Sequence, residues 1–167
     1  MHPLDRVNGL LALLALALGL WLWTQRPTAP APPPLTGLDP ATINEIRLYA
    51  GNTLGWSALR DNTGWTLTHP EVAAADADRI GQLLGILHTA SLTRFPAPAA
   101  LDAYGLARPA YRLVFDGHEI AFGATEPTTG LRYVLAGGQV QLIGDGFHHH
   151  LLAGAKGFRA AGPPGGG

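Results

Sequence analysis

A long apolar stretch near the N-terminus constrains this chain more than any other feature. Residues 7–23 read VNGLLALLALALGLWLW and contain no charged side chain, and Asn8 is the one clearly polar residue. At about 1.5 Å per residue, a helix of this length spans roughly 25 Å. This lies in the lower range for a helix that crosses the ~30 Å hydrocarbon core of a bilayer. Trp21 and Trp23 stand at its C-terminal end, where tryptophan favours the membrane interface. The pattern predicts a transmembrane helix within residues 1–26.

The charges that flank this stretch predict its orientation. Arg6 and the N-terminal amine precede it, and Arg26 follows it. Because positive residues near a span are retained on the cytoplasmic side, this slight bias places the N-terminus in the cytoplasm. A cleaved signal peptide is the alternative, since small residues occur at positions 28–31. Prolines at that place and the preceding tryptophans favour an uncleaved signal-anchor.

Composition divides the rest of the chain into a linker, a folded part and a tail. Residues 27–37 begin with PTAPAPPP, which disfavours helix and central strand and favours polyproline II. They predict a proline-rich spacer. Residues 160–167 read AAGPPGGG and predict a flexible Gly/Pro tail. Residues 38–159 remain, which is enough chain for one compact domain.

Hydrophobic patterning in this folded part predicts several short strands joined by turns. Glycine- and asparagine-containing turns separate most of them, as in antiparallel hairpins. The expected strands are residues 43–49, 54–59, 65–68, 92–95, 111–115, 119–122, 132–136 and 139–143. Short helices are expected at residues 99–104 and 147–152. The order predicts an α+β fold, with an antiparallel sheet or sheets and a few helices on one face.

The strongest helix signal of the folded part covers residues 76–89. Its apolar residues recur at helical spacing, and they are Ile80, Leu83, Leu84 and Leu87. Asp76 is the expected N-cap, because its carboxylate can accept an unpaired backbone N–H. Gly81 and Gly85 lower the helix propensity, and a close approach to the sheet would offset that cost.

Charge and cysteine content exclude several function classes. The chain has 11 Lys and Arg against 12 Asp and Glu, a formal net charge of −1, so we expect no nucleic-acid partner. It has no cysteine, which removes disulfides, zinc-thiolate and iron–sulfur sites, and thiol catalysis. The sequence also contains neither a G-x-S-x-G nucleophile elbow nor a phosphate-binding P-loop. We therefore expect no catalytic residue and no cofactor.

Three consecutive histidines are the candidate metal ligands. His148, His149 and His150 could bind zinc, copper or nickel through neutral imidazole nitrogens. Adjacent helical residues point about 100° apart, so all three cannot face one ion. Two of them would need help from Asp145 or His118. The alternative is a polar, exposed start of a helix.

Three carboxylates are the candidate acid–base groups of an enzyme. Asp116 and Glu119 sit at an expected hairpin, and Glu126 lies in the loop that follows. General acid–base chemistry would need two of them to converge in one cleft. Solvated surface positions, with a Glu126–Arg132 ion pair, are the expected alternative.

The segment LDAYGLARP at residues 101–109 resembles the element L-x-x-Y-G-L-x-x-P of a bacterial family called domain of unknown function 4340. Its matching positions are Leu101, Tyr104, Gly105, Leu106 and Pro109. Further similarities follow in family order: NEI at 44–46, GWTL with Trp65 at 64–67, AAD with Asp76 at 74–76, FG at 122–123, RYV at 132–134 and VQLI at 140–143. The resemblance covers residues 38–159.

The resemblance implies a membrane-anchored, extracytoplasmic α+β domain of bacteria. Relatives accompany ABC-type export or gliding-motility-like membrane components, and no catalytic residue can be carried over. The residues themselves suggest a structural role for the element. Gly105 can take a positive φ and end a short helix. Tyr104 can pack its ring with a wet hydroxyl, and Pro109 can begin the next strand at an edge-compatible position.

These observations lead to one hypothesis with two alternatives. We expect a single-pass protein of the bacterial cytoplasmic (inner) membrane, with a cytoplasmic N-terminus and a periplasmic C-terminal domain. It would serve as an accessory, assembly or interaction subunit of an envelope complex. Its expected partners are the lipid bilayer and other membrane or envelope proteins, ABC-type transporter components among them. The first alternative is a periplasmic small-ligand or metal sensor that uses residues 148–150, and the second is an envelope hydrolase.

Overall fold

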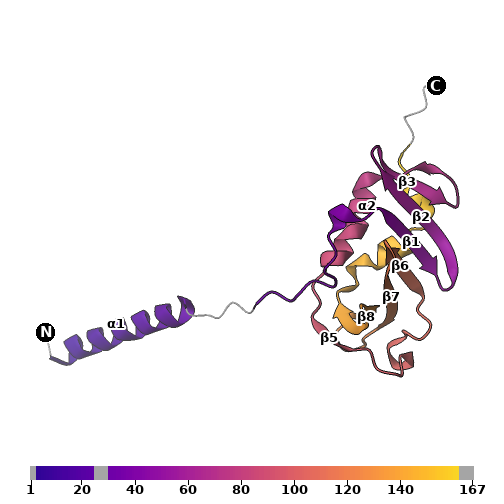
Figure 1. Cartoon of the computed structure of the whole chain (residues 1–167). Helices are drawn as coiled ribbons and strands as arrows, with labels where there is room; N and C mark the ends of the chain where they lie inside the picture. The colour runs from indigo at the N-terminus through magenta and orange to yellow at the C-terminus, as the bar shows by residue number, and fades with distance from the viewer. Residues whose placement is uncertain (1–2, 25–29, 162–167) are drawn as a thin grey trace. The chain divides into compact units, whose positions relative to one another are not determined.

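Two units, Met1–Ala31 and Pro32–Gly167, make up the chain in a computed structural model that describes residues 3–24 and 30–161 (Figure 1). The first unit holds helix α1 (Pro3–Thr24), whose described leucines and tryptophans are 54% to 72% exposed. Among the described residues, no helix meets the combination of length and hydropathy that crossing a membrane requires. The predicted transmembrane helix is therefore not confirmed. Parts of the predicted linker and tail, residues 27–29 and 162–167, lie outside the described residues.

The second unit is built on one nine-stranded antiparallel sheet, which confirms the predicted α+β class with an antiparallel sheet. The strands are β1 (Glu45–Ala50), β2 (Thr53–Asp61), β3 (Gly64–His69), β4 (Ala73–Ala74), β5 (Thr93–Pro96), β6 (Tyr111–Phe115), β7 (His118–Thr125), β8 (Arg132–Ala136) and β9 (Gln139–Ile143). Their order across the sheet is β4-β3-β2-β1-β6-β7-β8-β9-β5. All eight predicted strands are present, and β4 is the one that the patterning did not predict.

Two tight hairpins fix the register of the second half of the sheet. Asp116 (φ 46°) and Gly117 (φ 86°) join β6 to β7, and Gly137 (φ 56°) and Gly138 (φ 74°) join β8 to β9. Two-residue turns with positive φ at both positions match the twist of the strands they connect. The predicted turns at both places are therefore confirmed.

Helix α2 (Ala77–Leu84) begins where the sequence predicts. The Asp76 carboxylate accepts hydrogen bonds from the backbone N–H groups of Asp78 (3.0 Å) and Arg79 (3.1 Å), which confirms it as the N-cap. A 3-10 turn, η2 (Gly85–His88), continues the helix. The expected close approach of the two helical glycines to the sheet is wrong. A Cβ on Gly81 would meet open space, and one on Gly85 would meet the Phe147 ring at 3.9 Å.

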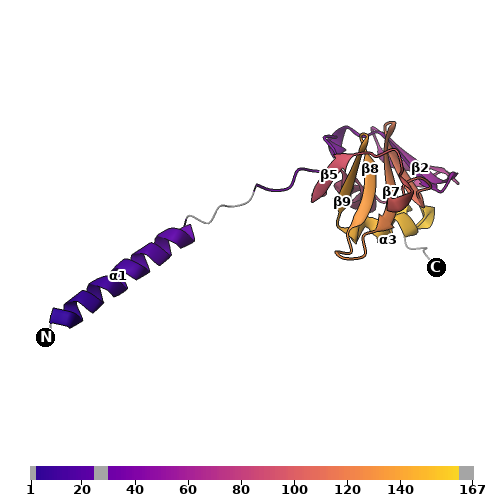
Figure 2. The same ribbon diagram turned by 90° about the horizontal axis from the view of Figure 1, so that it is seen from below.

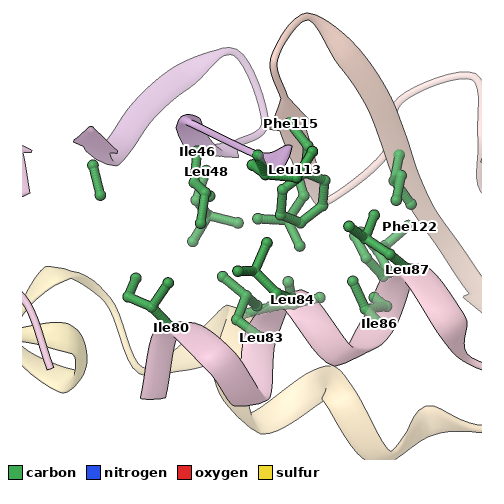
Figure 3. Close-up of a cluster of buried hydrophobic side chains, with 14 of the residues drawn as sticks. Ile46, Leu48, Ile80, Leu83, Leu84, Ile86, Leu87, Leu113, Phe115 and Phe122 are labelled. Carbon is green, nitrogen blue, oxygen red and sulfur yellow. The ribbon is translucent and has the colours of Figure 1, made fainter. Parts of the chain in front are cut away.

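The main core lies between α2–η2 and one face of the sheet. Figure 3 shows the helical side chains pointing toward those of β1, β6 and β7. The labelled helical residues are Ile80, Leu83, Leu84, Ile86 and Leu87, and the labelled strand residues are Ile46, Leu48, Leu113, Phe115 and Phe122. The C-terminal segment adds Leu151 of α3 (His148–Leu152) and Phe158 of η5 (Ala155–Phe158) to this core.

A second, smaller core lies on the opposite face of the sheet. Successive strand residues point to opposite faces. Ala121 and Val140 therefore face away from the main core. They are covered by the segment around η3 (Asp102–Tyr104), which contributes Leu101, Tyr104 and Leu106. The prediction that all helices lie on one face is thus wrong for η3.

The predicted linker extends too far toward the domain. Leu35 is only 3% exposed, and its N–H donates to the carbonyl of Thr89 at 2.7 Å. The N–H of Thr36 donates to the carbonyl of Leu87 at 3.1 Å. The second unit therefore includes residues 33–38, here named the strap, because burial of one leucine outweighs the extended tendency of the prolines before it.

Candidate functional site

A groove of about 480 Å³ lies between the strap (residues 33–38) and the strands β5, β7, β8 and β9. Figure 2 shows β5, β9, β8 and β7 side by side in this order. Apolar walls predominate, and the side chains that form them include Leu35, Leu38, Ile120 and Ala136. Polar residues at the groove include Arg94, His118, Glu119, Gln139 and Gln141, and Glu119 is paired with Arg112 at 3.4 Å. The volume falls in the lower part of the range of about 300–1,000 Å³ for ligand sites.

Arg94 of β5 and Gln141 of β9 hold the strap in place. They are direct cross-strand partners, so their side chains leave the same face of the sheet next to each other. Nη2 of Arg94 donates to the carbonyl of Pro34 at 2.8 Å. Nε2 of Gln141 donates to the next carbonyl, that of Leu35, at 3.1 Å. Two neighbouring side chains thus fix two successive carbonyls of the groove wall.

The same two residues retain unused hydrogen-bonding capacity. Gln141 is 2% exposed, and its buried Oε1 has no hydrogen-bond partner among the described residues. A buried acceptor left unpaired costs about 1–3 kcal/mol. Arg94 takes part in none of the ion pairs formed by the described residues. The groove therefore combines an unpaired acceptor, a cation without a carboxylate, and apolar walls.

The residues of the L-x-x-Y-G-L-x-x-P element have a structural role. Gly105 ends η3 with φ 67°, as predicted, and a Cβ there would lie 2.7 Å from the backbone nitrogen of Ala124. A Cβ on Gly123 would collide with the carbonyl oxygen of Tyr104 and with Leu106. The element is thus pressed against β7, and each side of the contact requires a glycine.

Tyr104 packs as predicted, between two other aromatic rings. Its ring centroid lies 5.6 Å from that of Phe95 and 5.0 Å from that of Tyr133. Pro109 was expected to begin the next strand at an edge-compatible position, and this expectation is wrong. The next strand, β6, begins only at Tyr111, and it lies between β1 and β7 in the middle of the sheet. Trp65 of β3 is half-buried against the main core, with the Arg60 guanidinium 6.0 Å from its ring.

A second cleft, of about 620 Å³, borders the same element on the other face of the sheet. Arg108 and Arg112 line it together with Glu119. Arg112 is held by Glu119 (3.4 Å), by the carbonyl of Gly51 (3.2 Å) and by the Tyr49 ring, whose centroid lies 5.0 Å away. Arg112 and Glu119 of this cleft are thus already bound to other groups of the fold. The Arg94 guanidinium at the groove, in contrast, has no carboxylate partner among the described residues.

The candidate acid–base carboxylates do not converge. Asp116 accepts hydrogen bonds from the backbone N–H groups of Asn44 (3.1 Å) and Glu45 (2.7 Å) and so fixes the start of β1. Glu119 pairs with Arg112. Their placement gives the hydrolase hypothesis no support.

Glu126 organises its own loop and forms no pair with Arg132. Its carboxylate accepts from the N–H of Thr128 (3.1 Å) and from the N–H (2.7 Å) and hydroxyl (2.5 Å) of Thr129. The Thr129 bonds, the hydroxyl first, lower the pKa of Glu126 from 4.5 to about 2. Arg132 instead forms a two-pronged pair with Asp145, at 2.5 and 2.9 Å, and this pairing lowers the pKa of Asp145.

The three histidines lie in three different environments. His148 is half-buried with its ring centroid 6.3 Å from that of Tyr111, His149 is exposed, and His150 is 6% exposed. Burial is the main cause of a lowered pKa for His150. Across residues 3–24 and 30–161, no cluster of three or more His, Cys, Asp or Glu could hold a metal ion. This arrangement does not favour the metal-sensor hypothesis.

The structure shows a small α+β domain with one antiparallel sheet and a groove along the strands at one end of it. The family comparison is more specific: the chain belongs to the family described as Domain of unknown function (DUF4340), whose model matches residues 65–162, more than half of the chain. The predicted family is confirmed, although the match begins at Trp65 and leaves out β1 and β2. Neither a curated protein nor a solved structure matches the chain.

Sequence reasoning missed the residues that build the groove. Leu35 was the only signal in the strap, as a large apolar residue directly after three prolines. Gln141 gave a second signal, because it interrupts an apolar run in a strand that has both faces covered. No sequence signal pointed to Arg94, because β5, which carries it, pairs with β9, a strand that is distant in the sequence. The predicted interfacial role of Trp21 and Trp23 stays a prediction.

Proposed function

We propose that this protein is a membrane-anchored accessory subunit that docks a partner protein in a bacterial envelope complex. The observation that supports it best is the groove, with a cation and an acceptor left unpaired. The candidate catalytic carboxylates, in contrast, are engaged in holding turns and strands together. A domain that presents unpaired recognition groups beside apolar walls is suited to binding.

The anchor is proposed from the apolar character of α1. Residues 11–23 are uninterruptedly apolar, so every side of the helix carries leucine, alanine or tryptophan. A helix that is apolar all round is buried in protein or in lipid. Its described side chains are exposed in the isolated chain, so we propose the bilayer of the cytoplasmic membrane as their environment.

Membrane attachment can be tested with matched charge variants. Leu14→Arg combined with Leu18→Arg should release the full chain from washed membranes, because arginine is costly in the hydrocarbon core. Leu152→Arg is the control, since this leucine is also exposed (60%) but belongs to the second unit. Release of the wild type by an alkaline wash would contradict the anchor.

Orientation has a direct test because the chain has no cysteine. Asn62→Cys places one thiol in the exposed turn between β2 and β3. A membrane-impermeant maleimide should label it in intact spheroplasts if the domain is periplasmic. Labelling only after lysis would overturn the proposed orientation.

Partner docking is tested with the full chain from native membranes in mild detergent. A partner protein should be recovered in constant ratio with the wild type and lost with Arg94→Glu at the groove. Arg108→Glu is the matched control, because Arg108 is exposed and lies in the second cleft. Recovery of the chain alone would contradict docking, and a partner retained by Arg94→Glu would exclude the groove as its site. The family resemblance makes ABC-type transporter components the first partners to look for.

A further inference from the structure

We infer that the groove binds the free carboxyl terminus of an extended partner segment. The Arg94 guanidinium would pair with the terminal carboxylate, and Gln141 Oε1 would accept a main-chain N–H of the last residues. This inference rests on the proposed docking function and specifies the chemistry of the partner.

The cation is the first element of recognition. A guanidinium has five N–H donors in a planar fork that matches a carboxylate. One hydrogen bond of the Arg94 guanidinium, from Nη2, goes to the carbonyl of Pro34. Glu119, the acidic residue at the groove, is paired with Arg112 at 3.4 Å and leaves Arg94 uncompensated. An anionic group entering the groove would therefore complete the coordination of Arg94.

The acceptor is the second element, and it selects a peptide over a simple anion. Gln141 lines the groove, and its Oε1 is buried without a hydrogen-bond partner among the described residues, so it is free to accept an N–H from a segment bound there. Cross-strand pairing sets the Cβ atoms of Arg94 and Gln141 about 4.5–5.5 Å apart. Because the two side chains are neighbours on one face of the sheet, a polypeptide terminus, which carries a carboxylate and an amide N–H within one residue, supplies a partner for each of them.

The walls provide the third element. Leu35 and Leu38 of the strap face the groove together with Ile120 and Ala136 of the sheet. These surfaces favour aliphatic side chains on the last residues of the bound segment, because apolar burial contributes about 25 cal/mol per Å². A volume of about 480 Å³ accommodates a few residues and no folded element.

The test uses the purified full chain in detergent and synthetic peptides. The probe is a fluorescently labelled, aliphatic hexapeptide that ends in Leu-Ala-Val with a free carboxyl group, and its matched control is the same peptide with a terminal carboxamide. We expect the free acid to bind and the carboxamide to bind at least ten-fold more weakly. Chemical shifts of the Ile120 and Ala136 methyl groups should move on binding of the acid.

Two variants with one control localise the effect. Arg94→Gln should weaken binding of the acid at least ten-fold, whereas Arg108→Gln should leave the affinity unchanged. Gln141→Leu should weaken binding of the acid and the carboxamide by the same factor. Because Arg94 and Gln141 also hold the strap, the thermal unfolding of each variant is measured to show that the domain stays folded.

Four results would overturn the inference. They are no binding of the acid at millimolar concentration, equal binding of the carboxamide, no effect of Arg94→Gln, and displacement of the peptide by free valine at equal concentration. None of them would affect recovery of a partner from native membranes. Failure of this inference is thus distinguishable from failure of the proposed function.

Discussion

The carbonyl oxygen of Tyr104 occupies the space that a Cβ on Gly123 would need. This contact presses the Tyr104–Leu106 turn against β7 and closes the second core over Ala121 and Val140. The tyrosine and glycine of the L-x-x-Y-G-L-x-x-P element are therefore explained by packing. The groove, which lies on the other face, remains the place where binding is to be sought.

The close approach at Gly123 predicts a large loss of stability for Gly123→Ala. A methyl group there meets main chain, which cannot move aside as a flexible side chain can, so we expect a loss of about 2–3 kcal/mol. Denaturant unfolding of the domain measures it. Gly146→Ala is the control, because a Cβ at that position meets open space. Equal stability of the two variants would show that the turn can shift without cost.

Gly81→Ala should have the opposite effect. Gly81 lies in the exposed part of α2, its backbone is helical, and a Cβ would contact nothing within 4 Å. Alanine removes conformational freedom from the unfolded chain and improves helix propensity, so a gain of about 0.5–1 kcal/mol is expected. Thermal unfolding would show a higher midpoint. A lower midpoint would mean that the glycine has a packing role.

We expect a loss of stability when the Asp116 carboxylate is removed, because it links the β6–β7 turn to the start of β1. Its carboxylate accepts N–H groups from Asn44 and Glu45, more than 70 positions earlier in the chain. Asp116→Ala leaves both donors without this acceptor and should cost about 1–3 kcal/mol. Asp116→Asn keeps one oxygen and tolerates the positive φ of 46°, so its cost should be smaller. Asp102→Ala serves as the control, and an equal loss for all three variants would contradict the role of the acceptor.

The strand order and the hairpins show what could be predicted from the sequence. Asp116-Gly117 and Gly137-Gly138 are local signals, and each connects strands that are neighbours in sequence. Pairing of β5 with β9 depends on residues nearly 50 positions apart, and no local pattern indicates it. The groove forms from this pairing and from Leu35, so its polar residues could not be brought together before the tertiary structure was known.

The Glu126 loop predicts a specific dependence on acid. The folded-state pKa of Glu126 is about 2, below its ordinary 4.5, because Thr129, through its hydroxyl and its N–H, and then Thr128 donate hydrogen bonds to the ionised carboxylate. The resulting stabilisation is fully present above pH ~4.5 and is lost as the pH falls toward 2. Carboxyl-detected NMR titration should give the low pKa directly. Glu126→Gln should remove this part of the acid dependence, and a measured pKa near 4.5 would contradict it.

His150 predicts a pH effect near neutrality. Its side chain is 6% exposed, between the rings of Phe147 (6.1 Å) and Phe158 (6.3 Å). Burial, followed by the charges of His149 and Arg79, lowers the pKa of His150 below its ordinary 6.5. The unfolded chain therefore binds a proton at higher pH than the folded chain does. Stability is fully present above pH ~6.5 and falls as the pH drops below it. Unfolding free energies measured from pH 7.5 to 5 should show this slope in the wild type and a smaller one in His150→Leu. If His150→Leu has the same slope as the wild type, the pH dependence of stability belongs to another titrating group.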